Sequence, residues 1–336
     1  MRLEVAESGQ AGTRLFRRWG GTPMGEDQAC SVIERSVHRM TLLGLRCRDP
    51  IFIVLAPPAL PPLFVSHGSP MTALEPREAG LFMQRLGPAL ERTFGRPRAV
   101  LAISAHSLTR EPALLGAARH EAIYDFGGFD DRLYTLRYDA PGEPALAREL
   151  AAALRQGGWP VHLVEQGGLD HGIWTPLRYM FPEADIPVLP LAWPADWAPA
   201  RLFALGQALA PLADDGVLVL GTGSLTHNLG RVFGRGRAHV DQPATPESTA
   251  FREWFAERSA QGDWDALLEY RQQAPHAVLM HPTDEHLLPW YVAAGAGGLY
   301  WPPRRVHASQ TFGDLAMDAY AFGPYAASLA EGLLEA

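Results

Sequence analysis

The sequence predicts an α/β fold, a single domain with a central, mostly parallel or mixed sheet flanked by helices. Short apolar runs alternate with longer segments of helical periodicity from Pro62 onward. Hydrophobic residues make up 47% of the chain and charged residues 20%. These proportions are ordinary for a globular protein and exclude a disordered or fibrous chain. Alternating strands and helices are expected of βα units that build a mainly parallel sheet.

Apolar runs rich in leucine and β-branched residues are predicted to form buried strands. They are Leu63–Ser66, Ala99–Ala105, Ala113–Ala117, Val161–Val164, Pro187–Ala192 and Val217–Gly221, with a last strand at Leu315–Phe322. The segments between and after them place apolar residues three and four positions apart, which predicts helices. The helices are Arg77–Arg92, Pro144–Gln156, Gly172–Met180, Pro199–Ala213, Pro246–Gln261, Ala266–Gln273 and Asp284–Ala294.

Residues 1–56 differ from the rest because arginines are scattered through them and no clean periodic segment is visible. We treat 1–56 as an N-terminal extension and 57–336 as one folded domain, since about 280 residues suit one large α/β domain. Met24 or Met40 could be the start of translation, which the mass of the protein from its natural source would settle. Arg2 and two glutamates interrupt the apolar core that a secretory signal needs, so we expect a cytoplasmic protein.

Charge and cysteine content exclude several classes of function. The formal net charge is −8 and the chain contains no lysine, which argues against a nucleic-acid partner. The most apolar run, Ile51–Val65, contains four prolines, so we expect no membrane span. With only Cys30 and Cys47, a disulfide framework and a cysteine-rich metal site are excluded. A metal site with nitrogen ligands is still compatible with the sequence, which contains 12 histidines.

Three histidines follow predicted strands. His67 and His106 come directly after their strands, and His227 lies just beyond Val217–Gly221. Ligands of open α/β sheets bind at the carboxyl ends of parallel strands. We therefore expect these imidazoles to converge at one edge of the sheet, although each one alone could be an ordinary turn or strand-end histidine.

His286 lies four residues beyond Pro282, in a segment that looks like a helix start. Thr283 is a natural N-cap, and Asp284 and Glu285 suit the positive end of a helix, so His286 is expected in its first turn. The two acids are most simply helix-start residues, but either could be a metal ligand, since non-haem iron sites commonly combine two histidines and a carboxylate. We expect His281 to be a loop histidine.

His171 and His227 both lie among glycines, which we expect to let a ligand approach the backbone closely. The segment Gly221-Thr222-Gly223 lacks the third glycine and the lysine of phosphate-binding loops. Nucleotide binding is therefore not predicted.

Together these segments resemble the class III extradiol ring-cleavage dioxygenases, a LigB-like family, and most closely its DOPA 4,5-dioxygenase branch. The resemblance runs from about Pro62 to about Gly323. Its motifs are Phe64-Val65-Ser66-His67-Gly68-Ser69-Pro70, Ser104-Ala105-His106, Tyr124-Asp125-Phe126-Gly127-Gly128-Phe129, Leu169-Asp170-His171-Gly172, Gly221-Thr222-Gly223-Ser224-Leu225-Thr226-His227-Asn228 and Pro282-Thr283-Asp284-Glu285-His286.

The resemblance implies one divalent metal ion, Fe(II) for catalysis or Zn(II) as bound, held by His67, His106 and His286. His171 and His227 match the family's second pair of active-site histidines, with His227 as a general base or as a fourth ligand. The implied reaction is the O2-dependent cleavage of a catechol ring, that of a DOPA-like substrate, beside its two hydroxyls. Three neutral imidazoles leave the metal charge uncompensated, which favours binding of an anionic catecholate.

Other interpretations stay open at this stage. The same imidazoles could serve a zinc hydrolase, or a metal- or ligand-binding protein without activity. Phe126 and Phe129 either form a wall for the aromatic substrate or belong to a packing loop. The chain could be a monomer or a homodimer.

Overall fold

The structure, a computed structural model, describes residues 3–7, 14–18, 59–234 and 239–335. The chain divides into two compact units, Met1–Pro57 and Pro58–Ala336, and each is described by itself. In the first unit, strand β1 (Leu3–Glu7) pairs antiparallel with β2 (Arg14–Arg18). The sequence shows no clean periodic segment there, so this hairpin was not predicted. The roles assigned to 1–56 and 57–336 stay predictions.

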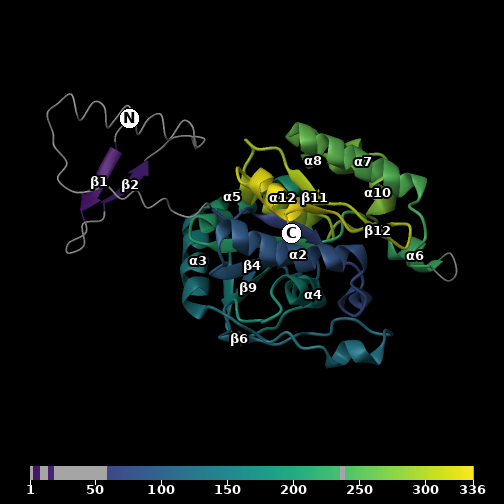
Figure 1. Ribbon diagram of the computed structural model, residues 1–336, viewed down its shortest axis with the longest axis horizontal. Helices are drawn as coiled ribbons and strands as arrows, with labels where there is room; N and C mark the ends of the chain where they lie inside the picture. The colour runs from purple at the N-terminus through teal and green to yellow at the C-terminus, as the bar shows by residue number, and fades with distance from the viewer. Residues whose placement is uncertain (1–2, 8–13, 19–58, 235–238, 336) are drawn as a thin grey trace. The chain divides into compact units, whose positions relative to one another are not determined.

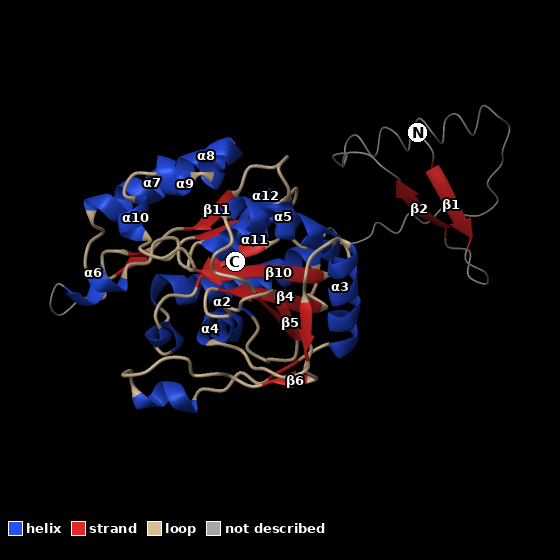
Figure 2. Cartoon of the chain, turned by 180° about the vertical axis from the view of Figure 1, so that it is seen from behind, coloured by secondary structure: helices blue, strands red, loops and turns tan. Residues whose placement is uncertain are grey.

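The second unit is built on an eight-stranded mixed sheet with the order β11-β14-β3-β10-β4-β9-β5-β8. Its central strands β3, β10, β4 and β9 are parallel, whereas β14 runs antiparallel to β3 and β5 runs antiparallel to β9. Strands β10, β4 and β5 of this sheet are labelled in Figure 2. The strands are β3 (Leu63–Ser66), β4 (Ala99–Ser104), β5 (Ala113–Leu115), β8 (His162–Val164), β9 (Val188–Ala192), β10 (Val217–Gly223), β11 (Arg304–His307) and β14 (Ala319–Ala321). The predicted α/β class with a mixed sheet is confirmed.

Two hydrophobic cores lie on the two faces of this sheet. Alternate residues of a strand point to opposite faces, so Leu101 and Ile103 of β4 join one core while Val100 and Ala102 join the other. Around the sheet (Figure 1), the first core takes residues from α3 (Pro144–Gln156), α5 (Pro199–Leu209), α7 (Pro246–Gln261) and α11 (Leu288–Gly297). The second takes residues from α2 (Arg77–Phe94), α4 (His171–Met180) and α12 (Ala326–Leu334).

Short elements complete this unit. The 3-10 helices are η1 (Pro70–Ala73), η2 (Asp131–Thr135) and η3 (Ala210–Ala213). The short helices are α6 (Leu229–Gly234), α8 (Trp264–Leu268), α9 (Tyr270–Gln273) and α10 (Ala277–Met280). Two small antiparallel pairs join β6 (Arg119–His120) to β7 (Ala140–Pro141) and β12 (Gln310–Thr311) to β13 (Leu315–Ala316).

Three predicted elements are divided in the structure. The strand expected over Leu315–Phe322 is divided into β13 and β14, and buried Asp318 between them pairs with Arg252 (Nε–Oδ2 2.9 Å). The helix expected over Ala266–Gln273 is interrupted at Glu269, which gives α8 and α9. The helix expected from Pro199 to Ala213 ends as α5 at Leu209 and continues as η3.

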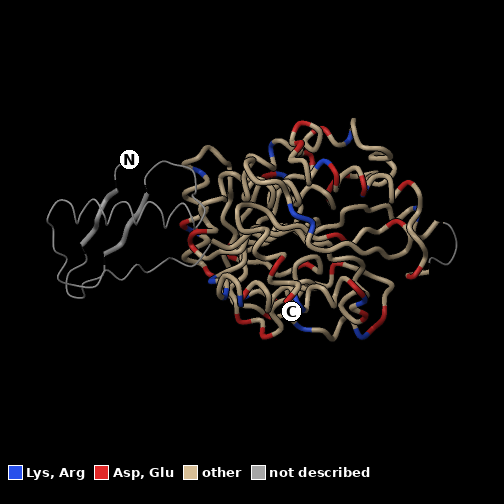
Figure 3. The backbone as a smooth tube through the Cα atoms, turned by 45° about the horizontal axis from the view of Figure 1, so that its top comes forward, with Lys and Arg blue, Asp and Glu red and all other residues tan. Residues whose placement is uncertain are grey.

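Charged positions of both signs are scattered over the described backbone (Figure 3). Among the described residues, no helix combines the length and the apolar composition that crossing a membrane requires.

Candidate metal centre

Five imidazoles from distant parts of the sequence gather beyond the carboxyl ends of β3, β4 and β10. His67 follows β3, His106 lies two residues after β4, and His171 is the first residue of α4. His227 lies four residues after β10, and His286 lies just before α11. The ring centroids of His106 lie 5.0 Å from those of His67 and His286 and 4.2 Å from that of His171. Parallel neighbours in the sheet bring these side chains to one edge, as the topology predicts.

The tautomer of His67 follows from its hydrogen bonds. The hydroxyl of Thr222 donates its only proton to the carbonyl oxygen of Gly172 at 2.7 Å. Its oxygen also lies 2.9 Å from Nδ1 of His67 and must accept the proton of that contact. His67 therefore carries its proton on Nδ1. The lone pair of Nε2 is left free, which is the state of a metal-binding imidazole.

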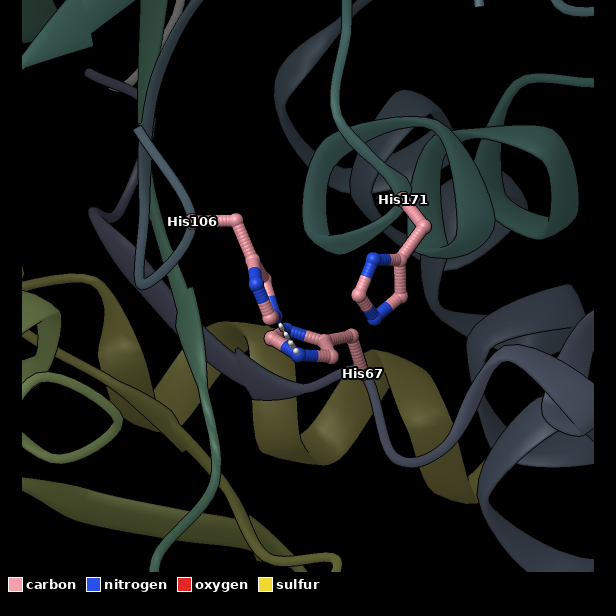
Figure 4. A group of neighbouring side chains, drawn as sticks. All are labelled: His67, His106 and His171. Carbon is pink, nitrogen blue, oxygen red and sulfur yellow. Dashed lines mark hydrogen bonds between the residues drawn. The ribbon is translucent and has the colours of Figure 1, made fainter. Parts of the chain in front are cut away.

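The spacing of His67 and His106 fits a shared metal ion. Their Nε2 atoms lie 3.1 Å apart, as the dashed line in Figure 4 shows. Imidazole nitrogens bound to one ion at about 2.1 Å, with bond angles of 90–109°, lie about 3.0–3.4 Å apart. His171 turns its ring toward the same space (Figure 4), and one nitrogen from each of the three rings lies within 4.8 Å of the others. The residues present therefore fit one divalent ion.

Carboxylates behind two of the rings set the same tautomer. Both carboxylate oxygens of Asp125 lie 3.0 Å from Nδ1 of His171, and Oε1 of Glu285 lies 3.0 Å from Nδ1 of His286. A carboxylate only accepts, so both rings donate from Nδ1 and keep Nε2 free. Partners of this kind orient metal-binding histidines and raise their basicity.

His227 lies differently from the other four rings. It stacks on His286 with a centroid distance of 3.4 Å and an angle of 8° between the planes. The lone pairs of an imidazole lie in the ring plane, so an ion in the plane of one ring is displaced from the plane of the other. One ligand atom from each of His227, His286 and Glu285 nevertheless lies within 4.8 Å of the others, so these three residues form a second group beside that of His67, His106 and His171.

Burial keeps the imidazoles of His67, His106, His227 and His286 neutral. Desolvation, reinforced by the neighbouring His171, lowers the pKa of His106 to about 4. Desolvation and the nearby His281 lower the pKa of His227 to about 4 as well. The pKa values of His67 and His286 fall well below their usual range, again chiefly because burial penalises the charged ring. Neutral rings with free lone pairs are what a divalent ion requires.

Three expectations about the His286 segment are corrected. His286 lies in a turn, because α11 begins only at Leu288, where Pro289 fits the first helical turn. The hydroxyl of Thr283 contacts Glu285 instead of capping the helix. Asp284, which we considered as a metal ligand, pairs with Arg271.

The glycines beside the histidines serve the protein's own packing. A Cβ atom on Gly223 would lie 2.0 Å from the carbonyl oxygen of His286, and one on Gly172 would lie 2.5 Å from Oγ of Ser104. We expected these glycines to let a ligand approach the backbone. Instead, backbone and side-chain atoms of this chain occupy the space beside them. His281, expected in a loop, is buried at the end of α10 and has its Nε2 atom 2.8 Å from the carbonyl oxygen of Leu225.

Comparison with known proteins identifies the family. The family model for the catalytic LigB subunit of aromatic ring-opening dioxygenase matches residues 61–322. The chain belongs to the LigB family. It is therefore an extradiol ring-cleavage dioxygenase whose site holds a single metal ion, with an aromatic substrate and O2.

Relatives of the LigB chain are similar over most of its length. The 4,5-DOPA dioxygenase extradiol of Beta vulgaris is 37% identical over 77% of this chain and 95% of its own. The protein of the same name from Escherichia coli K12 is 36% identical over 73% of this chain and 88% of its own. The crystal structure of an uncharacterized Escherichia coli K12 protein has a TM-score of 0.65 and 32% identity, covering 79% of this chain and 100% of its own.

Sequence reasoning missed the partners of the histidines. Thr222 and Asp125 lie within the quoted motifs but received no role, and Glu285 was considered only as a helix-start acid or a ligand. The available signal was their position in motifs that already contain a histidine or an aromatic pair. The contact of Asp125 depends on a loop that meets the start of α4 only in the fold, and that of Thr222, which lies in β10, depends on the pairing of β10 with β3.

Proposed function

We propose that this LigB chain is an Fe(II)-dependent dioxygenase that opens the ring of a DOPA-like catechol beside its two hydroxyls. The observation that carries the proposal is the free Nε2 lone pair of His67, 3.1 Å from Nε2 of His106. The names of the relatives from Beta vulgaris and Escherichia coli support the choice of DOPA as the first substrate to test.

We assign metal binding to His67, His106 and His286. Two rings can supply the third ligand atom. Besides His286, His171 has a free Nε2 atom, and one of its ring nitrogens lies within 4.8 Å of nitrogens of His67 and His106. His286 is preferred because the family resemblance implies it as the third ligand, which leaves His171 for proton transfer. The ring centroid of His171 lies closer to those of His106 and His67, at 4.2 and 5.3 Å against 5.0 and 5.6 Å for His286, so the choice between the two rings needs a test of its own. A bound Fe(II) supplies electron transfer between a chelated catechol and O2 held side by side.

The chain's own residues handle protons and exclude water. His227 is assigned as the base that accepts a proton from a catechol hydroxyl, because its ring stacks beside that of the assigned ligand His286. His171, with its Nε2 free, is assigned to proton transfer on the other side of the site. The ring centroid of Phe126 lies 5.5 Å from that of His171, with an angle of 89° between the ring planes, and 5.7 Å from the ring centroid of Phe129. This arrangement supports a role for the two phenylalanines as a wall for the aromatic substrate.

The substrate and metal can be tested in one experiment. Metal-free protein is loaded anaerobically with Fe(II) or Zn(II) and mixed with DOPA or simple catechols. We expect oxygen uptake and a yellow ring-opened product with Fe(II) only. Oxygen-independent turnover with Zn(II), or no iron-dependent oxygen uptake with any catechol, would overturn the proposal.

The ligand set is tested by metal content. His67→Ala and His106→Ala should abolish metal retention, and His286→Ala should do so while His171→Ala and His227→Ala retain most of the metal. The exposed His162→Ala is the matched control. If His171→Ala loses the metal and His286→Ala keeps it, the third ligand is His171 and the assignment fails.

A further inference from the structure

One carboxylate, that of Asp125, contacts two of the clustered imidazoles. Its Oδ1 atom accepts the backbone N–H of His171 at 2.9 Å, and both oxygens lie 3.0 Å from Nδ1 of the same residue. Its Oδ2 atom lies 3.5 Å from Nδ1 of His106. The side chain is only 23% exposed. Asp125 thus stands behind His171 and His106, on the side opposite their Nε2 atoms.

Backbone hydrogen bonds place the segment that carries Asp125 next to His171. Ile123 N–H donates to the carbonyl oxygen of Leu169 at 2.7 Å, and Leu169 N–H donates to that of Glu121 at 2.9 Å. The indole N–H of Trp174 in α4 donates to the carbonyl oxygen of Ile123 at 3.0 Å. The segment that carries Asp125 is therefore fixed in register against the strand-like entry to α4, the helix that begins at His171.

The contact determines which nitrogen of His171 is free. A neutral imidazole has a single N–H, and an ionised carboxylate offers only acceptors. The proton of His171 must therefore lie on Nδ1, and its Nε2 lone pair points into the histidine cluster. Phe126 meets the same ring edge-on at 5.5 Å, which limits its rotation from another side.

A second carboxylate, that of Asp170, has a different task. It accepts hydrogen bonds from the hydroxyls of Ser104 (2.7 Å) and Ser107 (2.6 Å) and from the backbone N–H of Ile173 (3.2 Å). Asp170 therefore ties the end of β4 to the start of α4. The contacts of Asp125, by contrast, include the imidazole nitrogens themselves.

We propose that Asp125 is a positioning residue that fixes His171 in the Nδ1–H tautomer and keeps the Nε2 atom of His171 directed into the histidine cluster. Its effect on turnover rests on the proposed function, whereas its effect on the tautomer does not. Removal of such a partner typically costs about 10- to 100-fold in metal affinity or activity.

The direct test reads the tautomer in the metal-free protein. Ring nitrogen-15 NMR is compared for the wild type and Asp125→Asn, with the His171 signal assigned by its loss in His171→Gln. We expect protonated Nδ1 in the wild type. In Asp125→Asn the amide can donate, so the tautomer should become mixed or reversed. Asp131→Asn, an exposed position in the same loop region, is the matched control and should not differ from the wild type.

Two further variants separate positioning from helix capping. Asp125→Ser keeps an acceptor for the backbone N–H of His171 but removes the carboxylate, so it should fold and still lose the fixed tautomer. Asp125→Glu keeps a carboxylate, so the Nδ1–H tautomer of His171 should be more populated in it than in Asp125→Asn or Asp125→Ser. An unchanged His171 tautomer in both Asp125→Asn and Asp125→Ser would overturn the inference.

Kinetics with Fe(II) and a catechol provide the second readout. Asp125→Asn should lower kcat about 10- to 100-fold with a smaller change in KM, and Asp125→Glu should recover part of kcat. A protein that turns over no catechol but shows the tautomer change would refute the proposed function and leave the positioning role intact.

Discussion

At the scale of single residues, the hydroxyl of Thr222 joins the metal centre to the core. It donates to the carbonyl oxygen of Gly172 and accepts from His67, so two buried polar groups depend on it. We predict that Thr222→Val lowers the affinity for Zn(II) by about 10- to 100-fold, because Nδ1 of His67 loses its acceptor. Competition with a chelator, starting from metal-free protein, measures this.

Thr175 is the matched control for this substitution. It is also buried, and its hydroxyl has no partner among the described residues. Thr175→Val should leave the Zn(II) affinity unchanged and the free energy of unfolding equal or higher, because burial of an unpaired hydroxyl is unfavourable. Equal losses of affinity in Thr175→Val and Thr222→Val would contradict the role of the Thr222 hydroxyl.

At the scale of elements, strand β10 needs glycine where the His286 turn crosses it. Cβ atoms on Gly221 and Gly223 would lie 2.4 Å from the carbonyl oxygen of Pro289 and 2.0 Å from that of His286. We predict that Gly223→Ala lowers the free energy of unfolding by about 1–3 kcal/mol and weakens metal binding, because the turn must move away from β10. Urea denaturation and metal titration measure the two effects.

Gly127→Ala is the control for that variant, since a Cβ atom there meets nothing within 4 Å. Gly127→Ala should change neither the free energy of unfolding nor the metal affinity. Wild-type metal affinity in Gly223→Ala would show that the close contact between β10 and the turn does not determine where His286 lies.

Elements with local signals were predictable to the residue. Helix α7 begins behind Thr245, whose hydroxyl accepts from Ser248 N–H, with Pro246 at its first position. Strand β3 is a short, fully buried apolar run. In contrast, β11 was missed because its residues are polar and half exposed at the sheet edge. The division of the last predicted strand depends on the pairing of Asp318 with Arg252, which lies 66 residues away in the sequence.

In the candidate site, too, local signals were predictable and long-range contacts were not. Convergence of His67, His106 and His227 was predictable because parallel strands end at one edge. The partners Asp125 and Glu285 were not predictable, because their contacts with the imidazoles depend on how loops are folded. The sequence therefore predicts which side chains meet more reliably than it predicts how their protons are arranged.

At the scale of the whole molecule, buried histidines make the stability of the metal-free protein depend on pH. Desolvation is the main cause that lowers the pKa in each of them. The pKa falls to about 4 for His106, His227, His281 and His307, and it is lowered without a value for His67, His120 and His286.

The sign of the effect follows from proton binding. Below about pH 6.5, the unfolded chain protonates these imidazoles while the folded protein keeps them neutral, so each contributes a loss of about 1.4 kcal/mol per pH unit. Buried Asp170 and Asp318 and half-buried Asp284 have raised pKa values, chiefly through desolvation, and oppose this trend below the pH at which they bind protons. We predict that the free energy of unfolding is highest above pH 6.5 and falls as the pH drops from about 6.5 toward 4.

Urea denaturation of metal-free protein at about pH 7.5, 6.5 and 5.5 measures the slope. His281 lies outside the proposed ligand set, and a glutamine amide can still donate to the carbonyl oxygen of Leu225. His281→Gln should therefore reduce the slope below pH 6.5 by about one proton, or 1.4 kcal/mol per pH unit. His162→Gln replaces an exposed imidazole and should leave the slope unchanged. A flat profile, or equal slopes for the wild type and His281→Gln, would mean that the buried rings are not kept neutral by the fold.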